Sequence, residues 1–275
     1  MNKRSRTVLY LVIFLSFLVV SIWTVYNVYI VPNREVRNSY AEVYQELEED
    51  INSIVINSVN QNLVIKPSED AKIHIAYYQK TQPDFASYSV SGSTVTLNML
   101  QRMEDMDSPF IPDSGQLATI TVYLPADNPV SIRYTSVEGE VRGSDVVCKS
   151  LNFSSRNGSV EINHVSAGSL SVSANFGRIT IANSDFSGIV LNSVSGSINL
   201  DLMESLDLYQ GHLETLHGTL SVNGNRIQVT SEDGNKVTVN ALILDGQEAN
   251  KKATVTSERG NITVTSDETS ESNEE

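Results

Sequence analysis

The sequence from residue 139 to residue 196 repeats itself at a fixed interval of 19 residues. The interval separates four glycines, Gly139, Gly158, Gly177 and Gly196, since 158 − 139, 177 − 158 and 196 − 177 are each 19. Two positions after each glycine stands an aliphatic residue: Val141, Val160, Ile179 and Ile198. A period of this length is typical of proteins that stack small units and bury each unit's apolar side against the next. The sequence therefore predicts a stack of similar units.

Each unit of the repeat contains two short segments with alternating apolar and polar residues. The second segment carries a further set of repeated apolar positions: Leu151, Leu170 and Ile189, with Phe153, Val172 and Leu191 two residues beyond them. A period of two predicts strands, and the glycines are expected at corners that need a positive φ. We therefore predict an all-β fold, a single-stranded β-solenoid. A β-sandwich with regular hairpins is the alternative, because it also contains short, evenly spaced strands.

The pattern of alternation extends to both sides of the regular repeat. Before it, strands are expected at 53–57, 62–66, 72–76, 94–97 and 119–123. After it, the glycine motif recurs with unequal spacing at 217–222, 233–239 and 259–264. The tail, 266–275, holds five carboxylates and no apolar residue, so we expect it to be disordered.

An uncharged, apolar run from Val8 to Val31 precedes all of these strands. It is long enough to cross the hydrocarbon core of a membrane as a helix. Lys3, Arg4 and Arg6 precede the run, which predicts a cytoplasmic N-terminus and an extracytoplasmic β domain. A cleaved signal peptide is the alternative, but the run is too long and lacks small residues at a cleavage site.

A short amphipathic helix is expected between the anchor and the strands, over 40–50. Ser39 and Glu42 form a capping-box pattern, and apolar residues then recur at helical spacing. The predicted organisation is a cytoplasmic tip and transmembrane anchor (1–31), a juxtamembrane spacer (32–50), an N-terminal β region (51–135), the solenoid repeats (136–265) and the acidic tail (266–275).

The segment from 122 to 198 resembles a known bacterial family. The strand end Val122–Pro125, the sequence Val137–Val141 and the repeated Ser-x-x-Gly-x-Ile/Val turns are similar to the "putative adhesin" β-strand repeat. The resemblance covers about 51–265 and implies a toast-rack-like β-solenoid of unknown function. It also implies a membrane-anchored Gram-positive envelope protein, some relatives of which are associated with envelope-stress responses. It supplies no catalytic residues.

Charge and composition narrow the function further. Residues 38–275 hold 14 basic and 32 acidic residues, a net charge of −18, which disfavours nucleic acid as a partner. The single cysteine, Cys148, aligns with Ala167 and Phe186 in the repeat and is expected to be a buried structural thiol. No metal, cofactor or nucleophile motif surrounds His74, His164, His212 or His217, which are expected in solvent or in turns. We predict a protein that is not an enzyme and needs no cofactor.

The segment 101–116 interrupts the strand pattern and is the best candidate for a partner-binding loop. Two prolines, a glycine and four carboxylates predict a loop, and long loops often bind partners. The candidate residues combine apolar and acidic side chains: Met103, Glu104, Asp105, Asp107, Phe110 and Asp113. A basic peptide or a Ca²⁺-bridged ligand would suit them, whereas a variable insertion with no partner is the alternative.

Two functions from different classes remain at this stage. One is a non-enzymatic interaction or scaffold protein of the cell envelope, with an envelope protein or peptide as its partner. The other is a surface adhesin or glycan-binding module. Aromatic side chains that stack on sugar rings would favour the second, but Phe176 has no aromatic equivalents in the repeat.

Overall fold

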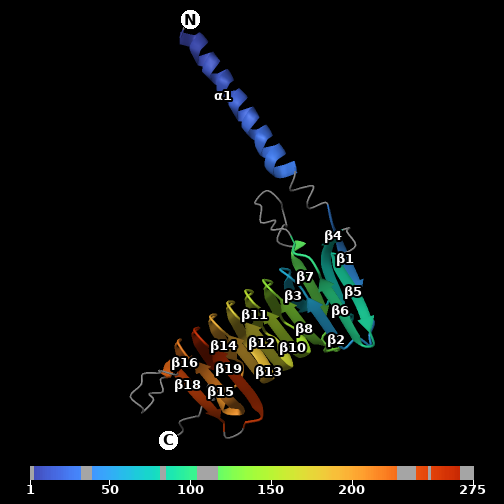
Figure 1. Ribbon diagram of the computed structural model, residues 1–275, viewed down its shortest axis with the longest axis vertical. Coiled ribbons are helices and arrows are strands. Elements are labelled where there is room, and N and C mark those ends of the chain that lie inside the picture. Colours follow the sequence, from blue (N-terminus) through green and yellow to red (C-terminus); the bar gives the residue numbers. More distant parts are fainter. Residues whose placement is uncertain are drawn as a thin grey trace.

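The computed structural model describes residues 3–31, 39–80, 85–103, 117–227, 240–246 and 249–266. An N-terminal helix is followed by a domain built from short strands, which stack into an elongated body (Figure 1). The helical elements are α1 (Lys3–Val25), a π-helical turn η1 (Tyr26–Ile30) and a 3-10 turn η2 (Leu206–Leu208). The strands are β1 (Tyr40–Glu46), β2 (Ser53–Asn57), β3 (Asn62–Pro67), β4 (His74–Lys80), β5 (Ala86–Ser91), β6 (Thr94–Met99), β7 (Thr119–Leu124), β8 (Ser131–Ser136), β9 (Val141–Ser144), β10 (Val147–Ser155), β11 (Val160–Asn163), β12 (Ser166–Ala174), β13 (Ile179–Ser193), β14 (Ile198–Leu202), β15 (Tyr209–Thr215), β16 (Leu220–Val222), β17 (Asn225–Ile227), β18 (Asn240–Asp245), β19 (Lys251–Ser257) and β20 (Ile262–Ser266).

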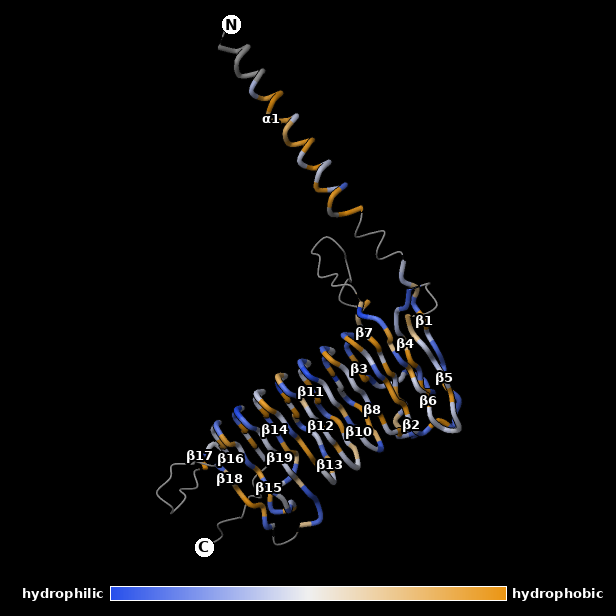
Figure 2. The backbone as a smooth tube through the Cα atoms, viewed as in Figure 1, coloured by the Kyte–Doolittle hydropathy of each residue, from blue (hydrophilic) through white to orange (hydrophobic). Residues whose placement is uncertain are grey.

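Helix α1 and η1 cover the apolar N-terminal run. The segment Tyr10–Val28 is long and apolar enough to cross a membrane, and none of it is buried in the protein (Figure 2). The hydroxyls of Ser16, Ser21 and Thr24 each donate a 2.8 Å hydrogen bond to the carbonyl four residues earlier. These bonds satisfy polar groups that would otherwise be costly in hydrocarbon.

The strands form two sheet faces, which we call face A and face B. Face A has the spatial order β1-β4-β7-β3-β9-β11-β13-β14-β20-β16-β17. Face B has the order β5-β6-β2-β8-β10-β12-β13-β19-β15-β18. The long strand β13 belongs to both, because its first half pairs with β11 and its second half with β12.

The parallel register between successive units is the one that the repeat predicts. On face A, Val160 pairs with Val141 and with Ile179, and Ile179 pairs with Ile198. On face B, Leu151, Leu170 and Ile189 form a second column. All of these residues are buried, so the aliphatic columns of the two faces make one continuous core. The predicted β-solenoid is confirmed, and the β-sandwich alternative is not.

The repeat glycines have a different role from the one expected. Their φ angles are not positive; instead, a Cβ added to Gly158 would lie 1.9 Å from the carbonyl oxygen of Gly139. The same approach links Gly177 to Gly158 and Gly196 to Gly177, at 1.9 and 1.8 Å. Glycine is therefore required here because the backbones of neighbouring units come too close for any side chain.

Positive φ is found instead at polar residues on another corner of the same units. Asp145, His164 and Asn183 have φ of 57°, 52° and 46°, and they are again 19 residues apart. Asp and Asn tolerate this left-handed conformation better than most residues. The two kinds of corner thus use two different solutions, close approach at glycine and positive φ at short polar residues.

In most units a hydroxyl three residues before the glycine bonds to the backbone of the glycine corner. Ser155 Oγ accepts a 2.9 Å hydrogen bond from the Gly158 N–H and donates a 3.3 Å bond to the Gly139 carbonyl. Thr215 makes the equivalent pair of bonds, at 3.1 Å to the Gly218 N–H and 2.8 Å to the Gly260 carbonyl. The hydroxyl accepts from the glycine N–H in the units that begin with Ser136, Ser193 and Ser257 as well, each at 2.8 Å.

The stacking order departs from the chain order at both ends of the solenoid. At the N-terminal end, β2 and β3 lie between β6 and β7 on one side and β8 and β9 on the other. At the C-terminal end, β19 and β20 lie between the preceding unit (β13, β14) and β15 and β16. The irregular motif at 259–264 is thus the fifth layer of the glycine column, since Gly260 stacks on Gly196. The motif at 233–239 lies outside the described residues.

The solenoid therefore begins well before residue 136. Strands β2 and β8 pair in parallel on face B, and β3 and β9 pair in parallel on face A. The regions 51–135 and 136–265 accordingly share both sheet faces. Of the tail 266–275, Ser266 ends β20 and the rest lies outside the described residues.

The helix predicted over 40–50 is wrong, because Tyr40–Glu46 is strand β1. It pairs antiparallel with β4 along its whole length, from Tyr40 opposite Lys80 to Glu46 opposite His74. The ring of Tyr40 packs edge-on against Phe85 at 5.6 Å. The pairing and packing available at the sheet edge outweigh the helical spacing of these residues, whose intrinsic preference is weak.

The glycine column predicts the effect of adding one methyl group. We expect Gly158→Ala to destabilise the domain by several kcal/mol, because the new Cβ would overlap the Gly139 carbonyl at 1.9 Å. Gly188→Ala is the matched control, since its Cβ would meet no atom closer than 3.9 Å. Urea unfolding followed by circular dichroism measures both. Equal midpoints for the two variants would contradict the close approach.

The third unit of the repeat lacks the hydroxyl, because Ala174 occupies that position before Gly177. We expect Ala174→Ser to stabilise the domain by about 0.5–1.5 kcal/mol, the net contribution of a typical hydrogen bond. We expect Ser155→Ala to destabilise it by about 1–3 kcal/mol, because the Gly158 N–H loses its partner. The measurement is again the free energy of unfolding. A destabilising Ala174→Ser would show that this unit has no room for the hydroxyl.

Candidate functional site at the N-terminal end of the solenoid

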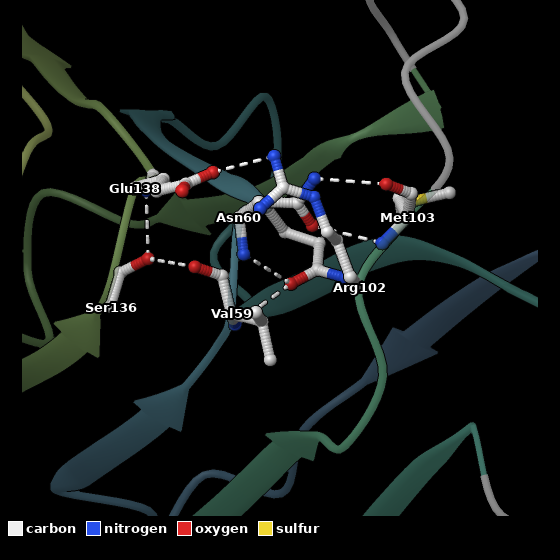
Figure 3. A network of polar contacts seen from close by, with 8 residues as sticks. Val59, Asn60, Arg102, Met103, Ser136 and Glu138 are labelled. Carbon is white, nitrogen blue, oxygen red and sulfur yellow. Dashed lines mark hydrogen bonds and ion pairs between the residues drawn. The ribbon is translucent and has the colours of Figure 1, made fainter.

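The root of the predicted binding loop is fixed by a network of polar contacts (Figure 3). The side chain of Asn60, in the turn between β2 and β3, bonds to both backbone groups of Met103. Its Nδ2 donates to the Met103 carbonyl and its Oδ1 accepts from the Met103 N–H, each at 2.9 Å. This two-point contact holds the chain in one position where the loop begins.

Two further contacts support the same root. Gln61 is buried; its Nε2 donates a 3.0 Å bond to the Gln101 carbonyl, and its Oε1 accepts from the N–H groups of Val59 and Asn60. The guanidinium of Arg102 lies 2.7 Å from the carboxylate of Glu138, which stands at the next corner. Three consecutive residues, 101–103, are thus each tied to a neighbouring turn.

The structure places one of the six candidate loop residues. Met103 is 1% exposed and belongs to the hydrophobic core, so its side chain forms part of the root rather than of a surface. The other five, Glu104, Asp105, Asp107, Phe110 and Asp113, lie outside the described residues. The loop therefore remains a candidate on the evidence of its sequence and its fixed root.

The residues that could carry catalysis lie far apart in the fold. Cys148 is buried in the column predicted for it, pairing with Ala167, and its burial raises the pKa of the thiol to about 12. His164 is at an exposed corner and His217 is also exposed, whereas His212 pairs with Glu214 at 2.8 Å. Over the part of the chain that the structure describes, no three His, Cys, Asp or Glu residues are grouped as metal ligands.

The prediction for the fourth histidine is wrong, because His74 is buried rather than solvated. Its ring lies beneath Tyr44, with centroids 5.0 Å apart and an interplanar angle of 27°. Tyr123 on β7 meets the same imidazole edge-on at 6.5 Å. We call these three rings the ring cluster. They come from β1, β4 and β7 of face A, and β7 is the strand that follows the 101–116 loop in the sequence.

Hydrogen bonds keep two side chains beside the ring cluster, Asp70 and Lys72, in their charged forms. His74 Nε2 lies 2.8 Å from Asp70 Oδ1, and Ser68 also donates to this carboxylate at 2.8 Å. These two bonds, that of His74 first, lower the pKa of Asp70 to about 2, so this carboxylate is ionised at all physiological pH values. Hydrogen bonding to Glu46 raises the pKa of Lys72 and keeps that ammonium group charged.

Sequence reasoning missed the ring cluster because its members are 30 and 49 residues apart along the chain, as 74 − 44 and 123 − 74 show. Tyr44 was also assigned to a helix. A local signal was nevertheless present. His74 and Tyr123 each occupy a position on the polar face of a strand in which apolar and polar residues alternate. What brings them together is the register of β4 with β7, in which His74 lies opposite Tyr123.

A shallow depression on face A is the other candidate surface among the described residues. Its volume is about 540 Å³, and it crosses the outward side chains of β9, β11, β13 and β14. Arg142 lies 2.9 Å from Glu140 and 3.8 Å from Glu161 within it. The lining holds two guanidinium groups, Arg142 and Arg178, and two carboxylates, Glu140 and Glu161, so its formal net charge is 2 − 2 = 0 and attracts neither a cation nor an anion strongly.

The root network predicts a measurable loss of stability when its central side chain is removed. We expect Asn60→Ala to cost about 1–3 kcal/mol, because both backbone groups of buried Met103 lose a partner. The control is Asn57→Ala, which removes an exposed side-chain pair with Asn98 and should change stability by less than about 0.5 kcal/mol. Chemical unfolding compares them, and equal effects would mean that the root is not fixed by Asn60.

Known structures with similar folds come from several bacteria. A "putative cell adhesion protein" from Clostridium sporogenes is 14% identical, with 83% of this chain and 100% of that chain covered and a TM-score of 0.45. A "putative adhesin" from Bacteroides fragilis is 15% identical, with 83% and 97% covered and a TM-score of 0.42. No curated protein matches this chain. The Toastrack DUF4097 family model matches residues 51–275, and the chain therefore belongs to that family.

Proposed function

We propose that this chain is a membrane-anchored, non-enzymatic interaction scaffold of the bacterial cell envelope. Helix α1 would be its single membrane span, with the N-terminus in the cytoplasm and the β domain outside. The length and composition of Tyr10–Val28 and the basic residues before it support this topology. The resemblance to the "putative adhesin" family extends the proposal to a role in envelope-stress responses.

The observation that carries the proposal is the fixed root of the 101–116 loop. Asn60, Gln61 and Glu138, from two different turns of the solenoid, each hold one of the residues 101–103. A binding loop gains affinity when its ends are fixed, because less conformational entropy is lost when it binds. We infer that the solenoid acts as a rigid support that presents this loop and its acidic residues to a partner.

The surroundings of the cysteine and of the histidines that are paired with carboxylates support a non-catalytic role. The thiol of Cys148 is buried with a strongly raised pKa, which disfavours the thiolate that nucleophilic chemistry requires. Two histidines, His74 and His212, are each paired with a carboxylate. His212 lies on β15, at the opposite end of the solenoid from β4, which carries His74 (Figure 1).

The second candidate, a surface adhesin or glycan-binding module, is favoured by one observation. Tyr44 is 61% exposed and lies beside the ring of Tyr123, at 6.4 Å between centroids. Exposed aromatic rings of this kind can stack on a sugar.

The decisive experiment replaces the loop and keeps its root. In the full-length protein, residues 104–116 are exchanged for a Gly/Ser linker of equal length, and the control exchanges residues 228–239 in the same way. Partners are captured in intact cells with a membrane-impermeant crosslinker. We expect the first exchange to abolish capture and the second to preserve it, because only the first removes the acidic loop residues.

Two results would contradict the proposal. Equal capture by both exchanged proteins would eliminate the loop as the binding element. Complete protection of the β domain from the impermeant reagent, in a protein shown to be in the membrane, would reverse the proposed topology.

A further inference from the structure

The ring cluster gathers aromatic side chains on one side of three neighbouring strands. On β1, Tyr44 lies opposite Ala76 of β4, and Ala76 lies opposite Thr121 of β7. In the adjacent row His74 pairs with Tyr123. The short side chains of Ala76 and Thr121 leave the ring of Tyr44 exposed, while the rings of His74 and Tyr123 are packed behind it.

A buried nitrogen atom without a hydrogen-bond partner distinguishes this cluster from ordinary aromatic packing. His74 is 5% exposed, its Nε2 bonds to Asp70, and its Nδ1 is a buried nitrogen without a hydrogen-bond partner. A buried polar atom with no partner costs free energy, so its presence asks for an explanation other than stability. Such an atom is satisfied when a water molecule or a ligand group reaches it.

The charges around the rings are predominantly negative. Strand β1 and the turn 68–73 hold four carboxylates, Glu42, Glu46, Glu69 and Asp70, and one ammonium group, Lys72, a difference of 1 − 4 = −3. Two further ammonium groups lie on neighbouring strands: Lys66 on β3 is opposite Tyr123, and Lys80 on β4 is opposite Tyr40. Lys72 is already paired with Glu46. After partial burial, the charge of Asp70 is the largest influence that raises the pKa of Tyr44, with Glu46 and Glu69 contributing as well. The exposed ring thus stands in a negative potential.

Aromatic faces and carboxylates together favour a cation. The faces of tyrosine rings carry negative electrostatic potential and attract ammonium and guanidinium groups. The protein already uses this interaction internally, since Lys80 lies 5.2 Å from the ring centroid of Tyr40 and Lys251 lies 5.8 Å from that of Tyr209. A neutral sugar could donate hydrogen bonds to the carboxylates but would gain no attraction between opposite charges, and anionic lipid headgroups would be repelled by them.

We infer that the ring cluster of Tyr44, His74 and Tyr123 binds a lysine- or arginine-rich segment of a partner protein. An ammonium or guanidinium group stacks on Tyr44, and Asp70 pairs with a cationic group beside it. This inference rests on the proposed scaffold function and gives its partner a chemistry.

The test measures binding of a fluorescein-labelled, capped hexalysine to the full chain in phosphatidylcholine nanodiscs at low ionic strength. We expect Tyr44→Leu to weaken binding about threefold to fivefold, which corresponds to one exposed cation–π contact, and Tyr44→Phe to retain it. Both variants keep the net charge of the protein. The matched control is Phe176→Leu, which removes an equally exposed ring, 62% against 61%, from the middle of the solenoid.

A second pair of probes separates charge from shape. The same peptide with all six amino groups acetylated should not bind, and affinity for hexalysine should fall as salt is added. Chitotetraose, a neutral β-linked tetrasaccharide, should not bind either. Equal hexalysine affinity for Tyr44→Leu and wild type would overturn the inference, as would binding of the acetylated peptide or of the tetrasaccharide at the affinity of hexalysine.

The outcome can be separated from that of the proposed function by repeating the in-cell crosslinking with Tyr44→Leu. If the loop exchange abolishes capture while Tyr44→Leu has no effect on it or on hexalysine binding, the scaffold function stands and the ring cluster is not its site. If Tyr44→Leu weakens hexalysine binding while the loop exchange leaves capture unchanged, the ring cluster binds cations and the loop is not the binding element.

Discussion

The close approach of backbone to backbone along the glycine column is the constraint on which the solenoid depends. Each repeat glycine lies so near the carbonyl of the preceding one that a single methyl group cannot fit between them. This contact sets the spacing at one corner of every unit. The aliphatic columns of faces A and B can then align in register, and they bury one continuous core without a disulfide. The serine and threonine hydroxyls add directional links. They accept from the N–H of the glycine in their own unit, and Ser155 and Thr215 also donate to the glycine carbonyl of a neighbouring layer.

The ends of the stack are subject to a constraint that does not apply to its middle. A stack of parallel strands would leave an unpaired edge at each end, and such edges invite association with other chains. Here antiparallel strands cover both ends of both faces: β1 and β5 at one end, β17 and β18 at the other. The N-terminal cover is also where the ring cluster and the loop root lie. The candidate binding surfaces are therefore built on the end strands, which are free of the strict repeat, rather than on the repeated units.

The sequence was sufficient for the regular part of the fold because the relevant information is local and periodic. The columns through Val160 and through Cys148 follow directly from the 19-residue interval, and the structure confirms both. The inserted layers could not be predicted, because nothing in the residues of β2 or β20 says that a later or an earlier unit will lie beside them. Strand β1 was mistaken for a helix since its pairing with β4 depends on residues 28 to 40 positions away. A similar separation, 43 positions, hid the loop root, where Asn60 recognises the backbone of Met103 rather than any side-chain motif.

The insertion of β19 and β20 inside the stack has a consequence for how the protein reaches its folded state. Strands β15 and β16 precede them in the chain, yet β19 and β20 separate both from the regular repeat. A chain that crosses a membrane from its N-terminal side delivers β15 and β16 first, when the layer they must pair with has not arrived. Completion of the solenoid therefore cannot proceed as a simple zipper from the first unit to the last. The segment that carries β19 and β20 must enter between the regular repeat and β15 and β16, so the order of assembly at this end differs from the order of the chain.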